Sequence, residues 1–153
     1  MGLTWWSAAA LAGILLAASV CDLFSRRLPG LRRARRIPAA LTWGSVAAGL
    51  LATFVTHGSV LGSLAGVGLG LAILAPFVWR GVLGEADALL LGAVGAWTSW
   101  QFVLAVALWT SVAGALIAVV YALRCPKGKD WRRRVYPYVP AITIGTALAA
   151  IIR

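Results

Sequence analysis

Residues 81–123 decide the fold, and they read GVLGEADALLLGAVGAWTSWQFVLAVALWTSVAGALIAVVYAL. This run of 43 residues contains only two charged side chains, Glu85 and Asp87. As one helix it would measure about 64 Å, whereas the hydrocarbon core of a bilayer is about 30 Å thick. The run therefore crosses a membrane twice, and the sequence predicts an integral membrane protein.

The composition of the rest of the chain supports this class. Hydrophobic residues make up 61% of the 153 residues and charged residues 12%, about half the charged fraction of a soluble domain. Glycines 58, 62, 66 and 70 recur at four-residue spacing, which predicts a helix face that lets a neighbouring helix approach closely. The apolar blocks predict an all-α, polytopic transmembrane bundle of about six helices in a single domain over residues 1–153, with helices near 3–21, 39–55, 60–78, 88–97, 102–123 and 135–152.

The lysines and arginines predict how these helices are oriented. The connections at residues 57–59 and 98–101 contain none of them. Because basic loops remain in the cytoplasm, we predict that both termini are extracytoplasmic and that the basic loops contact anionic membrane lipids. On this topology 13 of the 14 basic residues fall on the cytoplasmic side: Arg26, Arg27, Arg32, Arg33, Arg35, Arg36, Arg80, Arg124, Lys127, Lys129, Arg132, Arg133 and Arg134.

The same features disfavour several classes of function. The net charge of +10 is explained by topology, and no pattern of stacking aromatic residues accompanies it, so we expect no nucleic-acid binding. Cys21 and Cys125 have no companion histidines at a zinc-ligand spacing, and we expect neither a metal nor a cofactor. The single histidine, His57, falls in a connecting loop far from either cysteine, and we interpret it as a loop residue.

The four acidic residues are the candidates for chemistry, because ionisable groups close to the hydrocarbon are costly and usually functional. Asp130 lies among basic residues, and local charge compensation is a sufficient explanation for its presence. Asp22 is predicted to end the first helix, where the dipole disfavours an anion, and the structural alternative is an ion pair with Arg26. Asp87 is predicted at the start of the fourth helix, where it could equally be a cap, and Glu85 could be a first-turn anion.

Asp22 and Asp87 together indicate more than either does separately. Both fall at predicted cytoplasmic helix ends, 65 residues apart in the chain, so a bundle can bring them face to face. Two close carboxylates do not both ionise easily, and one of them keeps its proton. Such a pair provides a base that activates water and an acid that protonates a leaving nitrogen, which suffices for hydrolysis of a peptide bond.

Three stretches resemble motifs of the type IV prepilin peptidases: ASVCDLFSRRLP at 18–29, GEADALL at 84–90 and YPYVPAI at 136–142. In that family, an aspartate at a helix end is followed by basic residues and a Leu-Pro step. The second motif is Gly-x-Gly-Asp-x-Lys, and the third is the proline-rich start of the last helix. The resemblance implies that Asp22 and Asp87 are catalytic. Gly84 and Pro140, in the second and third motifs, are candidate supporting residues, and Glu85 is an added carboxylate that either couples to the pair or faces solvent.

The resemblance also implies the activity and its location. It predicts an aspartic endopeptidase of the bacterial inner membrane that cleaves the leader peptides of prepilins and pseudopilins at the cytoplasmic face. The larger members of the family carry a four-cysteine insertion and methylate the new N-terminus. This sequence is more similar to the short, peptidase-only members of tight-adherence (Flp) pilus systems, and we expect cleavage without N-methylation.

Some features depart from the family pattern. Ala86 stands where the family has a glycine and Leu89 where it has a lysine, and both Pro29 and Pro38 match the proline step. The altered motif supports one alternative, a catalytically impaired paralogue that binds pilins. A second alternative is a small ion- or proton-coupled transporter, although the acids lie at the membrane boundary and no inverted repeat is evident. In a third, the acids are only structural.

Overall fold

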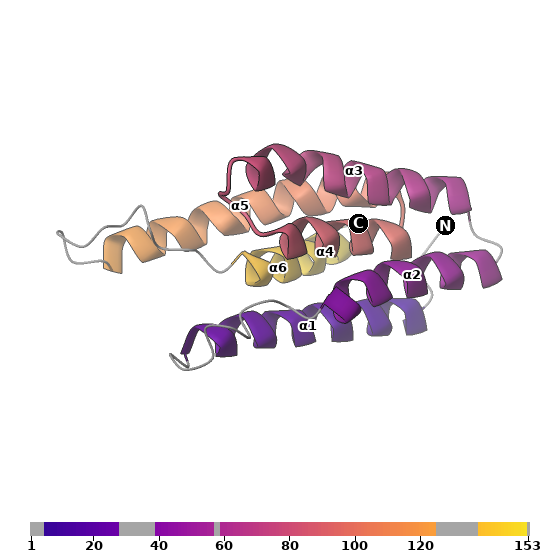
Figure 1. Ribbon diagram of the computed structural model, residues 1–153, viewed down its shortest axis with the longest axis horizontal. Coiled ribbons are helices and arrows are strands. Elements are labelled where there is room, and N and C mark those ends of the chain that lie inside the picture. Colours follow the sequence, from indigo (N-terminus) through magenta and orange to yellow (C-terminus); the bar gives the residue numbers. More distant parts are fainter. Residues whose placement is uncertain (1–4, 28–38, 57–58, 125–137, 153) are drawn as a thin grey trace.

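The computed structural model describes residues 5–27, 39–56, 59–124 and 138–152 (Figure 1). Within these residues the chain forms six helices and no strand, and the helices run along the long axis of the molecule (Figure 1). The predicted all-α bundle is therefore confirmed. The helices are α1 (Trp5–Arg27), α2 (Ala39–Val55), α3 (Val60–Trp79), α4 (Glu85–Trp97), α5 (Trp100–Arg124) and α6 (Val139–Ile151).

Three of the six helices are long and apolar enough to cross a membrane, over Trp6–Leu23, Val60–Trp79 and Trp100–Val120. α2 and α6 are apolar but shorter. Their packing on the three long helices makes one transmembrane bundle. His57, Asp130, Cys125, both candidate proline steps and most of the basic loop residues lie outside the described residues, so the predicted orientation stays a prediction.

The first helix is longer than predicted. α1 continues past Cys21 to Arg27, so the prediction that Asp22 ends this helix is wrong. Residues 22–27 contain no helix breaker, and the first residue that restricts the chain is Pro29, which disfavours a helical conformation at the position before it. Asp22 consequently lies inside α1, more than one turn before its end.

α4 is the central helix of the bundle. It begins at Glu85, three residues before the predicted start, and its buried residues are Ala88 and the seven consecutive residues 90–96. It contacts each of the other five helices, as expected for a helix that is apolar on all sides. With 13 residues it measures about 20 Å, which is less than the thickness of the hydrocarbon core.

A seam of glycines joins α3 to α4. A Cβ built on Gly66 would lie 2.8 Å from the carbonyl oxygen of Gly95, and one on Gly70 would lie 2.8 Å from the backbone nitrogen of Gly92. Only glycine lets two helix backbones approach this closely. The predicted close approach is confirmed at Gly66 and Gly70, whereas a Cβ on Gly62 would meet only the Ser59 side chain of its own helix cap.

Candidate active site

Asp22 continues the buried stripe of α1. Leu11, Leu15 and Ala18 are buried at 3%, 2% and 0% exposure, and Asp22 follows Ala18 by four residues, which places both on one helix face. The aspartate itself is partly buried. The alternative ion pair with Arg26 involves a side chain outside the described part of the chain. Asp22 thus lies at the point where the core-facing stripe of α1 turns from apolar to acidic.

Asp87 lies in the first turn of α4 and caps that helix. Its Oδ2 accepts a hydrogen bond from the backbone N–H of Gly84 at 3.1 Å, and its own N–H donates to the Gly84 carbonyl at 3.1 Å. These two hydrogen bonds between Asp87 and Gly84 confirm the predicted capping role. A carboxylate offers two oxygens with about four lone-pair sites, so a capping bond to one oxygen is compatible with chemistry at the other.

The two aspartates lie at the same end of the bundle. The end of α1 and the starts of α4 and α6 all lie at the left of Figure 1. On that side α1 and α5 extend beyond the start of α4 (Figure 1). The same core cluster includes Ala18 of α1, Ala88 near the start of α4 and Val139 at the start of α6. The start of α4 is therefore recessed relative to the ends of α1 and α5 (Figure 1), and Asp87 in its first turn is partly buried.

The predicted supporting residues have distinct local roles. Gly84 is the N-cap of α4 in an extended conformation, and a Cβ there would lie 3.4 Å from Asp87 Oδ2, so the glycine leaves room beside the carboxylate. Glu85 is exposed in the first turn of α4. Pro140 is the second residue of α6, where its fixed φ favours helix initiation. Ala86 occupies the first turn of an intact helix, so the departure from glycine is compatible with the helix start.

Tyr138 lies in the third motif but was not among the predicted site residues, and its position places it near Asp87. It is the N-cap residue of α6, and its ring packs on α5, where a Cβ at Gly114 would lie 3.4 Å from the ring Cε2. Burial raises the pKa of the Tyr138 phenol above its ordinary value of 10.0, and the negative charge of Asp87 raises it further. Tyr138 is therefore close enough to Asp87 to sense its charge.

Replacing Asp87 by asparagine is expected to lower the pKa of Tyr138, because the nearby negative charge disappears. The pKa should remain above 10.0 because the burial remains. The measurement is a pH titration of tyrosinate absorbance in Tyr121→Phe/Tyr136→Phe protein, in which Tyr138 is the one tyrosine left of three. An identical titration curve with and without Asp87→Asn would contradict the proximity of the two groups.

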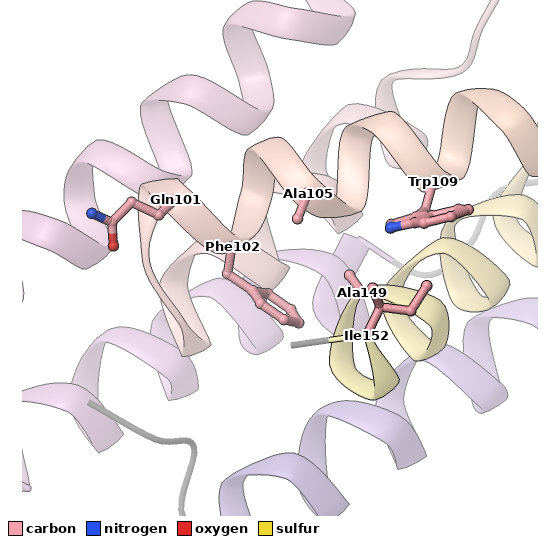
Figure 2. Close-up of a pocket in the computed structure, with 6 residues that line it drawn as sticks. All are labelled: Gln101, Phe102, Ala105, Trp109, Ala149 and Ile152. Atoms are coloured by element: carbon pink, nitrogen blue, oxygen red, sulfur yellow. The ribbon is translucent and has the colours of Figure 1, made fainter.

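A cavity of about 210 Å³ lies at the other end of the bundle, where α5 begins and α6 ends. Figure 2 shows the side chains of Phe102 and Trp109 on α5 directed toward α6. None of its lining residues ionises, and the cavity is separate from the aspartates. The lining residues are Gln101, Phe102, Ala105, Trp109, Ala149 and Ile152.

The fold and the site define a class: a transmembrane helical bundle with two aspartates at one end. The sequence profile of the type IV leader peptidase family matches residues 9–119 of the chain, a range that contains both aspartates. The chain belongs to this family, and the resemblance noted in the sequence is confirmed.

Two curated relatives agree with this assignment. The chain is 31% identical over 141 residues to the prepilin leader peptidase/N-methyltransferase of Burkholderia pseudomallei strain 1026b and, equally, to that of strain K96243. The alignment covers 90% of this chain and 43% of each relative, so the chain spans less than half the length of the curated relatives it matches. No solved structure matches the chain significantly.

Proposed function

We propose that this protein is a membrane-embedded aspartic endopeptidase that cleaves the leader peptides of prepilins and pseudopilins. The location of Asp22 and Asp87 at one end of the bundle, in a chain of the leader peptidase family, carries the proposal. We place that end at the cytoplasmic face of the bacterial inner membrane, because the basic segments flank it in the sequence. The same segments would contact anionic lipids.

The helix environments favour a division of labour between the two aspartates. Asp87 lies at the N-terminus of α4 and accepts a backbone hydrogen bond from Gly84, and both features stabilise negative charge on its carboxylate. Asp22 lies inside α1 and is assigned the complementary role of the acid. In this proposal Asp87 is the base that takes a proton from the attacking water.

The catalytic cycle then needs no further proton carrier. Water adds to the scissile carbonyl as Asp87 accepts its proton, and the Asp22 carboxyl donates a proton to the departing nitrogen. Cleavage leaves Asp87 protonated and Asp22 ionised. Exchange of one proton between the two carboxyl groups, directly or through water, restores the starting state.

Cleavage of candidate prepilins by the purified protein in detergent or in membranes tests the proposal. Wild-type protein should release the leader peptide. A wild type that binds every prepilin offered and cleaves none would instead favour the impaired paralogue, and ion flux through the protein in liposomes would favour a transporter. Because Ala86 leaves the start of α4 intact, we favour the active enzyme.

The mature pilin N-terminus is expected to remain unmethylated. We propose the peptidase activity only, because the resemblance is to short members of the family that cleave without methylating. The measurement is mass spectrometry of cleaved pilin after incubation with S-adenosylmethionine. Addition of a methyl group to the new N-terminus by the purified protein would contradict this prediction.

A further inference from the structure

A hydroxyl pair joins α1 to α6 close to the candidate active site. Ser19 lies three residues before Asp22, so both project from one side of α1. Its Oγ is 2.7 Å from Oγ1 of Thr143 on α6, the distance of a good O–H···O hydrogen bond. Ser19 is buried, at 8% exposure, and little water can compete for this contact.

The neighbouring acceptors show why this pair is a specific link. Thr143 Oγ1 also lies 3.1 Å from the carbonyl oxygen of Val139 in its own helix and 3.4 Å from that of Leu15 on α1. A threonine hydroxyl has one proton, so when Thr143 donates to either carbonyl, the Ser19 hydroxyl donates to Thr143. In each arrangement Thr143 connects α6 to the segment of α1 that carries Asp22.

The residue before α6 also senses the charge of the other aspartate. Tyr138 immediately precedes α6 and is close to Asp87. The first turn that follows is packed tightly, with Val139 at 1% exposure and Ala141 and Ile142 at 0%. Five residues separate Tyr138 from Thr143, which is about one and a half helical turns. A short, buried piece of α6 therefore lies between Tyr138, which senses the charge of Asp87, and Thr143, which contacts α1.

We propose that Thr143 is a positioning residue, which holds α1 through Ser19 and thereby sets the place of Asp22 relative to Asp87. α6 acts as the spacer, because it contacts both helices that carry the aspartates. This inference deepens the proposed function and rests on it for its catalytic consequence. The geometric part, the separation of residues 22 and 87, is independent of any activity.

The geometric test is disulfide formation between cysteines placed at positions 22 and 87. Asp22→Cys/Asp87→Cys is built in a Cys21→Ser/Cys125→Ser background, and the rate of cross-linking by an added oxidant is measured. Thr143→Val should slow it, because valine keeps the shape of threonine and removes the hydroxyl. Thr146→Val is the matched control, since Thr146 donates within α6 to Ile142 at 2.8 Å, and it should leave the rate unchanged.

The catalytic test uses the two aspartates intact. Thr143→Val and Ser19→Ala should each lower kcat about 3- to 20-fold, the factor that corresponds to the free energy of one hydrogen bond between membrane helices, with little change in KM. The double variant should be no slower than the worse single variant, since both changes remove the same link. Thr146→Val should match the wild type.

The outcomes separate the two proposals. Slower cross-linking in Thr143→Val, together with a wild type that cleaves no prepilin, would support the positioning role and reject the peptidase. Equal cross-linking in Thr143→Val and Thr146→Val, or no cross-link in either, would overturn the positioning role. Loss of kcat in Thr146→Val as large as in Thr143→Val would overturn it as well.

Discussion

Asp22→Asn and Asp87→Asn are each expected to lower kcat for leader-peptide cleavage by about 10²- to 10⁴-fold, the usual contribution of a general acid or base. An amide neither accepts a proton from the attacking water nor donates one to the leaving nitrogen. Because the two carboxyl groups act as a unit, the double variant should be little worse than either single one. Prepilin cleavage in detergent, followed by gel shift, measures the effect.

Asparagine is the informative substitution at position 87 because it separates the two roles of that residue. Its side-chain oxygen can still accept the hydrogen bond that Gly84 now donates to Asp87, and the loss of one charge in the first turn of a helix costs only about 0.3–1 kcal/mol. The helix start should therefore persist while catalysis is lost. Unchanged thermal unfolding of Asp87→Asn is the check that the protein remains folded.

Glu85→Gln is the matched control for the loss of an acid at this helix start. Glu85 is exposed in the same turn as Asp87, and its replacement should leave kcat within about 2-fold, as for an exposed residue away from the reacting atoms. If cleavage survived Asp87→Asn, Asp87 would be only a cap, and the two-aspartate mechanism would be rejected.

Gly95→Ala is expected to destabilise the bundle by about 1–3 kcal/mol or more, as overpacking does in a core. The new Cβ would overlap the backbone of Gly66 across the seam, and a backbone has no rotamer by which to move aside. α4 carries Asp87 and packs on every other helix, so misplacement of this helix should also reduce cleavage. Thermal unfolding in detergent, monitored by tryptophan fluorescence, measures the loss.

Two glycines provide controls for this change. A Cβ on Gly92, in the same helix, would meet Leu71 Cγ at an ordinary 3.5 Å, and a Cβ on Gly68 of α3 would meet nothing within 4 Å. Gly92→Ala and Gly68→Ala should therefore be close to the wild type in stability. A Gly95→Ala protein as stable as these two would show that α3 and α4 do not approach closely at this point.

Local features of the chain were well predicted from its sequence. The limits of α2 matched the predicted range, and α3 began as predicted and ended one residue later. This agreement arises because both apolar runs are uninterrupted and because Ser59 caps the start of α3. The capping role of Asp87 was one of the predicted alternatives, because the cap depends only on Gly84, three positions away in the sequence. The error at α1 arose because apolar length was taken as the limit of the helix, although the charged residues that follow are compatible with helix.

The sequence alone determined the membrane class, because its apolar run is longer than a bilayer is thick. It also selected Asp22 and Asp87, because the chain has only four acidic residues and these two fall in the motifs that resemble the family. The tertiary structure decided that α4 is central, that Tyr138 lies near Asp87, and that Ser19 meets Thr143. Ser19 and Thr143 are 124 residues apart. Contacts of this kind depend on how whole helices pack, and no local pattern in the chain encodes which faces of two distant helices will meet.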